Sequence, residues 1–233
     1  MESLKNKVAV ITGASDGIGK EIAIALSKAG ARVALVSRNR EKLTKTVQQI
    51  GKTKSKFYQC DIRKTCDIGK AVKAITADFG KIDILVNNAG IIHKPMTLED
   101  MDEETVDSVL DTNLKGMIHV TRLFMPHFKK NSDGAIINIS SVAGTRAKKG
   151  ESVYAASKWG VRGFTKVLKE DLGETNIRVA CVCQGGTATE LFKKAGDNRD
   201  TTRFTRPGDL AQVILFMLTR PKRCWIHEIH VEK

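Results

Sequence analysis

Tyr154 and Lys158 lie four residues apart in a segment with helical periodicity. In a helix this spacing places the two side chains on one face. An ammonium about 4 Å from a phenol contributes on the order of 4 kcal/mol at an effective dielectric of about 20. This would lower the phenol pKa by roughly three units from its usual value of about 10. Tyr154 is therefore a candidate proton donor and acceptor.

Ser140 and Ser141 directly follow a strand expected over residues 135–139. A hydroxyl at the end of that strand can hydrogen-bond the oxygen of a substrate. The residue types alone leave both serines as candidates. Tyrosine and lysine at this spacing are common by chance, so the combination of the two motifs carries the argument.

The sequence TGASDGIG, residues 12–19, lies between an expected strand and an expected helix. Glycine permits a tight turn and close backbone approach, and the free N–H groups at the helix start attract phosphate. The alternative is a tight connection without a ligand. In the ligand interpretation, the residues expected around a dinucleotide pyrophosphate are Gly13, Ser15, Asp16, Gly17, Ile18 and Gly19.

The end of the second expected strand has no acidic residue to bind the ribose hydroxyls of NAD. It carries Ser37 and Arg38 instead, and a guanidinium beside a hydroxyl suits a 2′-phosphate. NADP(H) is therefore the expected cofactor. The alternative is that Arg38 and Arg40 are only solvated residues at a helix start.

Two more loops follow strands at the same edge of the expected sheet. Asp61 and Ile62 would lie near the adenine, one as a carboxylate and one as an apolar surface. Asn88, Ala89 and Gly90 would let the backbone approach the ribose while asparagine amides tie neighbouring strand ends.

Strands and helices alternate along the chain, which predicts a doubly wound parallel sheet of the Rossmann type in three α/β/α layers. One domain is expected over residues 1–233. A long helix at 105–130 contains Pro126, where a bend or early stop is expected. Residues 187–206 are expected as a mobile loop with one short helix. The expected strands are 7–11, 32–36, 56–59, 82–86, 135–139, 178–182 and 226–231, with a helix at 208–218 before the last.

The net charge is +13, with 41% hydrophobic and 28% charged residues. Basic residues are spread along the chain and aromatics are only 5%, which argues against a nucleic-acid partner. No apolar run is long enough for a membrane span, and the start does not resemble a secretory signal. Five cysteines indicate reduced thiols and a cytoplasmic protein. Only Cys181 and Cys183 are close in sequence, and no further ligands are visible, so no metal site is expected.

The five motifs TGASDGIG, NNAG, NLKG, ISSVAG and YAASK occur in this order. Together they resemble the short-chain dehydrogenase/reductase family, in its compact form, over nearly the whole chain. The resemblance implies that Tyr154 exchanges the proton, Lys158 binds the ribose and lowers the Tyr154 pKa, and Ser141, thirteen positions before the tyrosine, binds the substrate oxygen. It implies that the backbone of Asn113 holds a water that links Lys158 to solvent.

The resemblance also implies hydride transfer between a nicotinamide and a carbonyl or alcohol carbon, in a homodimer or homotetramer formed through the helices of Asn113 and Tyr154. Gly185, Thr187 and Thr189 would complete the cofactor site. The sequence departs from the family pattern at Gln184, where a proline is usual, and the extra glycine freedom puts the order of this loop in doubt.

A basic segment, Arg146 to Lys149, lies between Ser141 and Tyr154. It predicts an anionic or carrier-linked substrate, as in 3-oxoacyl-(acyl-carrier-protein) reductases, and a solvated lysine turn is an equal alternative. His93 either points toward substrate or is an exposed loop residue. Two other function classes stay open: a dinucleotide-binding regulator without turnover, and a basic nucleic-acid-binding protein. A sugar-nucleotide epimerase would need a larger substrate domain.

Overall fold

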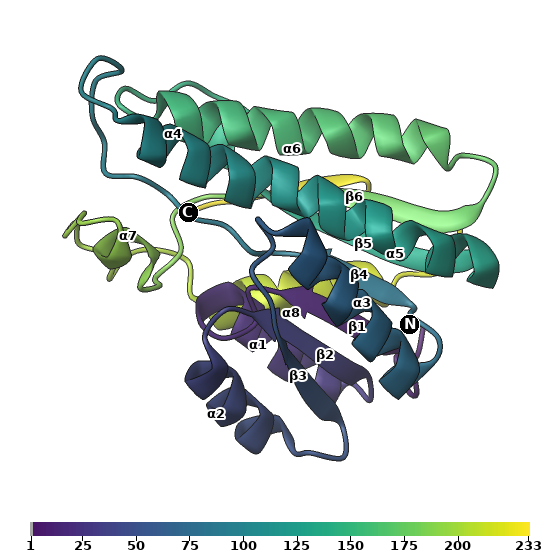
Figure 1. Ribbon diagram of the computed structural model, residues 1–233. Helices are drawn as coiled ribbons and strands as arrows, with labels where there is room; N and C mark the ends of the chain where they lie inside the picture. The colour runs from purple at the N-terminus through teal and green to yellow at the C-terminus, as the bar shows by residue number, and fades with distance from the viewer. Residues whose placement is uncertain (1) are drawn as a thin grey trace.

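A single sheet of seven parallel strands runs through the protein, in the order β3-β2-β1-β4-β5-β6-β7 (Figure 1). The computed structural model describes residues 2–233. The expected doubly wound, Rossmann-like fold is confirmed. The strands are β1 (Val8–Thr12), β2 (Arg32–Ser37), β3 (Ser55–Gln59), β4 (Ile84–Asn87), β5 (Asp133–Ser141), β6 (Asn176–Gln184) and β7 (Glu228–Val231).

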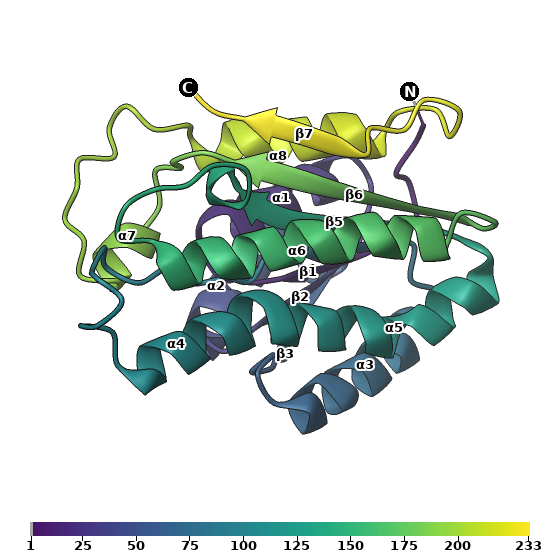
Figure 2. The same ribbon diagram turned by 90° about the horizontal axis from the view of Figure 1, so that it is seen from above.

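Helices cover both faces of the sheet, as Figure 2 shows from above. On one face lie α1 (Gly17–Lys28), α2 (Arg40–Ile50) and α8 (Pro207–Leu218). On the other lie α3 (Thr65–Phe79), α4 (Glu103–Leu110), α5 (Met117–Asn131) and α6 (Ser152–Asp171). Each face has its own apolar core, and all five residues of β1 are buried. Burial on both faces explains why this strand is a continuous apolar run.

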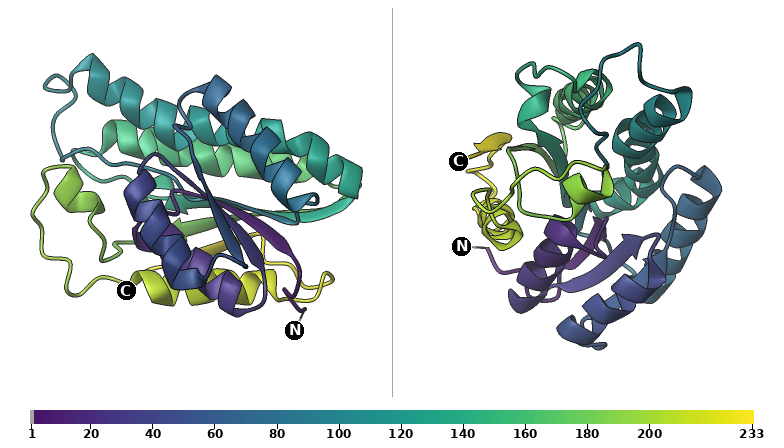
Figure 3. Two further views of the ribbon diagram at one scale, coloured as in Figure 1. Left: turned by 60° about the horizontal axis from the view of Figure 1, so that its bottom comes forward. Right: turned by 90° about the vertical axis from the view of Figure 1, so that its left-hand side faces the viewer.

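The chain starts in the middle of the sheet, builds outward to β3, and returns to place β4 beside β1. The carboxyl ends of β1 and β4 therefore flank the point where the strand order reverses. Ligands of doubly wound sheets bind in the crevice at this point. A one-turn helix, α7 (Leu191–Lys194), lies over the same edge (Figure 3).

The predicted helix at 105–130 is present, but Pro126 does not end it. Pro126 and Arg122, four residues earlier, are both exposed, so the carbonyl that loses its partner faces solvent. A π-helical turn, Asp111–Gly116, joins α4 to α5 and contains Asn113. Among residues 2–233, no helix combines the length and apolar character that a membrane crossing requires.

The loop at 187–206 is tied to its surroundings at both ends. Thr187 forms a parallel bridge with Thr205, and the Gly185 N–H donates to the Val231 carbonyl oxygen over 2.7 Å. A β-carbon at Gly186 would lie 2.7 Å from the Phe204 ring, and one at Gly185 would lie 2.9 Å from Glu232. The glycines after Gln184 therefore permit close packing of this loop against Phe204 and Glu232.

Candidate active site

A cavity of about 430 Å³ opens at the carboxyl ends of the central strands. Loops after β1, β2, β3 and β4 line it, together with α6. It brings together most of the residues expected to bind a dinucleotide. Those that line it are Gly13, Ser15, Asp16, Gly17, Ile18, Ser37, Arg38, Asp61, Ile62, Asn88, Ala89, Gly90, Tyr154, Lys158 and Thr189.

The turn after β1 depends on two glycines for different reasons. Gly13 has φ of +67°, which side chains rarely adopt, and an added β-carbon would lie 2.8 Å from Nδ2 of Asn88. Gly19 was expected to contact cofactor, but it does not line the cavity; it packs against the Gly13 carbonyl and Asn88. The turn thus leaves the free N–H groups of α1 facing a cradle that fits a pyrophosphate.

Asp16 caps the N-terminus of α1 and carries two lysine contacts that the sequence did not reveal. Its carboxylate accepts hydrogen bonds from the Gly17 N–H at 2.8 Å, from Nζ of Lys42 at 2.5 Å and from Nζ of Lys194 at 3.1 Å. Partial burial opposes ionisation, but the lysine hydrogen bonds prevail and hold the pKa of Asp16 at about 2. The carboxylate therefore gathers two cations at the cavity.

The end of β2 presents Ser37 and Arg38 to the same cavity. The Ser37 hydroxyl lies 2.9 Å from that of Ser15. Arg38 is exposed and makes no ion pair with any residue from 2 to 233. By contrast, Arg63 binds Asp61 through two nitrogens, and this hydrogen bonding lowers the pKa of Asp61. Arg38 is thus the guanidinium at this rim that is available to an anion.

The loop after β4 is fastened to the glycine turn. The Thr12 hydroxyl accepts from the N–H groups of Asn88 at 3.0 Å and of Ala89 at 3.1 Å. Nδ2 of Asn88 donates to the Thr12 carbonyl oxygen over 2.9 Å. The predicted tie between neighbouring strand ends is therefore confirmed.

Asn113 is buried and lines neither this cavity nor the next. Its side chain accepts from the Ile91 N–H at 2.8 Å and donates to the Ile91 carbonyl oxygen at 2.9 Å and to the Ser157 hydroxyl at 3.1 Å. These contacts fix the loop after β4 against α6. The expected role of its backbone in holding a water stays a prediction.

Tyr154 and Lys158 lie on one face of α6, with Nζ of Lys158 5.7 Å from the centre of the Tyr154 ring. Both side chains are buried. The expected lowering of the phenol pKa is wrong for the chain alone: burial raises the pKa of Tyr154 to about 12, although a hydrogen bond with Ser141 opposes this. Burial also lowers the pKa of Lys158 to about 8, so Lys158 is still mostly an ammonium at neutral pH but loses its proton more easily than a free lysine.

The two serines after β5 have different environments. The Ser140 hydroxyl donates to the Lys158 carbonyl oxygen over 2.9 Å and is fully buried. The Ser141 hydroxyl accepts from the Ala143 N–H at 3.2 Å and lines a second cavity together with Tyr154. Ser141 is thus the serine that faces the phenol.

His93 is buried rather than exposed as a loop residue. Its Nε2 accepts from the Tyr154 N–H at 3.4 Å, and its Nδ1 lies 2.8 Å from the Lys94 carbonyl oxygen. The first N–H groups of a helix have no partner within it, and α6 has no side-chain N-cap. His93 supplies that partner for the N–H of Tyr154, the residue with the candidate phenol.

The second cavity, of about 420 Å³, adjoins the first at Tyr154. Arg146 and Lys148 of the basic segment line it, as do Gly185 and Thr187. Arg146 pairs with Glu232 at 2.6 Å and Lys148 with Glu151 at 2.7 Å. Arg203 lines the cavity without an ion pair to any residue from 2 to 233.

The sequence also matches known proteins of one family. A family model described as short chain dehydrogenase matches residues 7–200. The chain belongs to the short-chain dehydrogenase/reductase family. An uncharacterised oxidoreductase of Staphylococcus epidermidis is 34% identical over 231 residues, which is 99% of each chain. A second one, from Staphylococcus aureus, is 33% identical over 232 residues and is covered to the same extent.

Solved structures of this family have the same fold, and some of them contain a bound nicotinamide dinucleotide. A serine dehydrogenase complexed with NADP⁺ has a TM-score of 0.92 at 30% identity, covering 97% of this chain and 94% of its own. The 3-ketoacyl-(acyl-carrier-protein) reductase from Brucella melitensis, complexed with NADH, has a TM-score of 0.90 at 34% identity, covering 98% of each. The short-chain dehydrogenase/reductase described here is therefore an oxidoreductase that uses a nicotinamide dinucleotide.

Proposed function

We propose that this short-chain dehydrogenase/reductase is an NADPH-dependent enzyme that interconverts a carbonyl group and a secondary alcohol. One observation carries the proposal: Tyr154 and Lys158 line the same cavity as the glycine turn and Arg38, and Tyr154 also lines the adjoining cavity with Ser141. A substrate in the second cavity would meet both the phenol and the dinucleotide.

The bound dinucleotide would supply or accept the hydride. In the reduction direction, Tyr154 donates its proton to the carbonyl oxygen, and its raised pKa keeps the phenol protonated at neutral pH. The Ser141 hydroxyl hydrogen-bonds the same oxygen. Lys158 binds the ribose hydroxyls and stabilises the phenolate that remains. Asn113 keeps α6 and the loop after β4 in place and holds the relay water through its backbone.

NADPH is favoured over NADH by two features of this rim. Arg38, at the end of β2, has no ion-pair partner among residues 2–233, and Lys42 and Lys194 donate hydrogen bonds to the Asp16 carboxylate nearby. A 2′-phosphate is a dianion, and a guanidinium binds it through two parallel hydrogen bonds. Asp61 and Ile62 would flank the adenine, and Gly185, Thr187 and Thr189 would hold the carboxamide end. The solved relatives carry both NADP and NADH, so the preference rests on these side chains.

The substrate is proposed to be anionic or carrier-linked. Arg146, Lys148 and Arg203 all line the cavity beside Tyr154, although acidic residues pair with the first two. Trp159 and Val167 of α6 are 49% and 61% exposed, which supports a homodimer or homotetramer formed through α5 and α6. Five free cysteines support a reducing, cytoplasmic setting.

The test is to compare wild type with Tyr154→Phe in two assays. Thermal shift measures binding of NADPH and NADH, and absorbance follows NADPH oxidation with a panel of charged and neutral carbonyl compounds. We expect both proteins to bind NADPH and only the wild type to turn over. The alternative, a dinucleotide-binding regulator, predicts a thermal shift without turnover in either protein. Turnover that survives in Tyr154→Phe would remove the proposed proton donor.

A further inference from the structure

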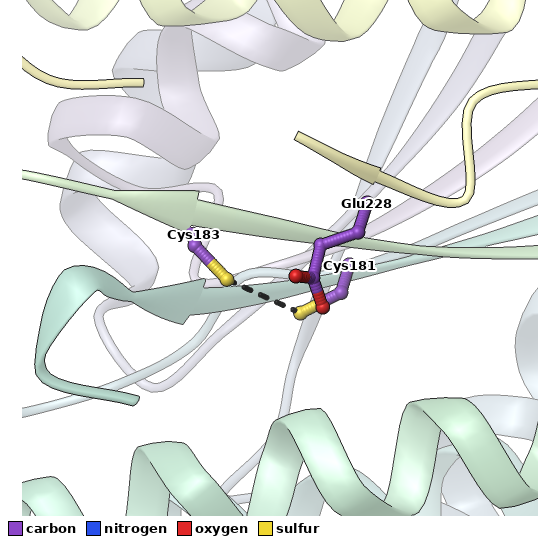
Figure 4. Close-up of side chains that lie close together, drawn as sticks. All are labelled: Cys181, Cys183 and Glu228. Atoms are coloured by element: carbon purple, nitrogen blue, oxygen red, sulfur yellow. Dashed lines mark hydrogen bonds between the residues drawn. The ribbon is translucent and has the colours of Figure 1, made fainter. Parts of the chain in front are cut away.

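Two thiols and a carboxylate meet at the edge of the sheet, with an imidazole beside the carboxylate, and none of these four residues lines the cofactor cavity. In the register of β6 and β7, Cys181 lies opposite Glu228 and Cys183 lies opposite His230. Residues two apart in a strand point to the same face, and paired residues of parallel strands share it. All four side chains therefore lie on the face covered by α6. Figure 4 shows Cys181, Cys183 and Glu228 directed toward one another.

The distances suit a metal ion. The two Sγ atoms are 3.9 Å apart, and these atoms and a Glu228 oxygen all lie within 4.8 Å of one another. Two sulfurs bound at about 2.3 Å around a tetrahedral zinc ion are about 3.8 Å apart. Nε2 of His230 lies 3.0 Å from Oε1 of Glu228 and can orient that carboxylate by a hydrogen bond. The sequence alone did not show this set because 45 or more residues separate the cysteines from β7.

Arg162 of α6 fixes the carboxylate. Its Nε and Nη2 each donate to a different oxygen of Glu228 over 2.8 Å. Oε1 also receives the contact from His230, so the second lone pair of Oε2 is the one left for a metal. Outer hydrogen bonds of this kind orient metal-binding side chains.

We propose that Cys181, Cys183 and Glu228 form a binding site for one zinc ion, with a solvent molecule as the fourth ligand and His230 supporting Glu228. Two sulfur ligands and one oxygen ligand at this spacing favour zinc over harder cations such as magnesium or calcium. Binding converts two thiols to thiolates and releases two protons to solvent, with no change in oxidation state. The charges of zinc and Arg162 then balance those of the two thiolates and Glu228.

The site has a route to solvent and a mechanical consequence. A third cavity, of about 430 Å³, is lined by Cys181 and Glu228 together with residues of α6. The side chain of His230 is 44% exposed. An ion entering there would bridge β6 to β7, a four-residue strand at the edge of the sheet. We therefore expect zinc to stabilise the C-terminal edge of the fold.

A disulfide is the competing use of the two thiols, and the geometry favours the metal. A disulfide would bring the sulfurs to about 2.05 Å, with Cα atoms two apart in a strand at the upper limit of the permitted range. The zinc site needs almost no change in the sulfur separation. The test is therefore run with a non-thiol reductant present throughout, so that oxidation does not compete.

Co²⁺ is the spectroscopic probe, added to the full chain from which metals were first removed by a chelator. We expect one equivalent to produce sulfur-to-cobalt charge-transfer absorption and the strong visible bands of a tetrahedral site. Zn²⁺ should abolish both bands and raise the Tm. Cys183→Ala should lose the charge-transfer band, whereas the exposed-cysteine controls Cys66→Ser and Cys224→Ser should keep it.

Glu228→Gln and His230→Ala keep both sulfurs and test the site if the cysteine variant does not fold. Each should retain the charge-transfer band with affinity reduced about tenfold or more. The proposal is overturned if Co²⁺ gives no charge-transfer band in the wild type. It is also overturned if the band persists in Cys183→Ala or is lost in Cys66→Ser or Cys224→Ser. A Co²⁺ affinity that is the same in Glu228→Gln, His230→Ala and the wild type would overturn it as well.

Discussion

The N–H of Tyr154 donates to Nε2 of His93, although 61 residues separate the two in sequence. The acceptor role of Nε2 places the ring proton on Nδ1, which faces the Lys94 carbonyl oxygen. The loop after β4, which borders the cofactor cavity, is thereby attached to the start of α6. The position of the phenol thus depends on a buried histidine that lines neither the first nor the second cavity.

Replacing His93 by Ala should lower kcat by about tenfold and stability by about 1–2 kcal/mol, because a buried helix N–H loses its acceptor. The KM for NADPH should stay unchanged, since the cofactor loops are held by Thr12 and Asn88. Steady-state kinetics and urea unfolding measure these effects, with His127→Ala on α5 as the control. An unchanged kcat would show that the contact does not position Tyr154.

Replacing Lys158 by Met should raise the stability of the cofactor-free protein at neutral pH while it abolishes turnover. The folded chain releases the Lys158 proton at about pH 8 and the unfolded chain near 10.5, so the unfolded state binds more protons between these values. The cost of burying the ammonium is complete below about pH 8 and disappears as pH rises toward 10.5.

The free energy of unfolding should rise in Lys158→Met by at most on the order of 3 kcal/mol near pH 7. The lost hydrogen bond to the Ile139 carbonyl oxygen reduces this gain. Near pH 10 the difference from wild type should largely vanish. Urea unfolding at both pH values measures it. If Lys158→Met is less stable than the wild type by the same amount at both pH values, burial of the Lys158 ammonium has no net cost.

Replacing Arg38 by Ala should weaken NADPH binding by about ten- to a hundredfold, the value of one charge-assisted contact of about 1.5–3 kcal/mol. NADH binding should change little because it lacks the 2′-phosphate. Calorimetric titration with each cofactor gives the ratio of the NADPH and NADH affinities in each variant. Arg40→Ala is the control, since Arg40 stacks over Phe57. Equal losses for the two cofactors would place Arg38 away from the phosphate.

Replacing Arg203 by Gln should raise the KM for anionic carbonyl substrates about tenfold, equivalent to about 1.4 kcal/mol, and leave that for neutral ones unchanged. Added salt should reduce kcat/KM in the wild type for the anionic class alone. Lys149→Gln, outside the cavity lining, is the control. If charged and neutral substrates respond alike, the basic lining has no role in selection.

The strand positions, the doubly wound fold class and most of the cavity lining could be predicted because they follow from short-range patterns: apolar runs, a glycine turn, and polar residues directly after strands. Long-range contacts could not. Lys42 and Lys194 converge on Asp16 from 26 and 178 residues away, and no local pattern marks either lysine. Nor does sequence show that burial outweighs charge at Tyr154, because the pKa depends on how deeply α6 packs.

An ion cluster centred on Asp16 lies at the proposed phosphate site. Lys42 and Lys194 already hold an internal anion at the start of α1, so an arriving dinucleotide exchanges one negative partner for another rather than meeting two free cations. Affinity should therefore respond to ionic strength less steeply than the number of nearby lysines suggests. Because Lys194 belongs to α7, whose Leu191 and Phe192 line the second cavity, we expect this exchange to alter the contacts of a segment beside the proposed substrate site.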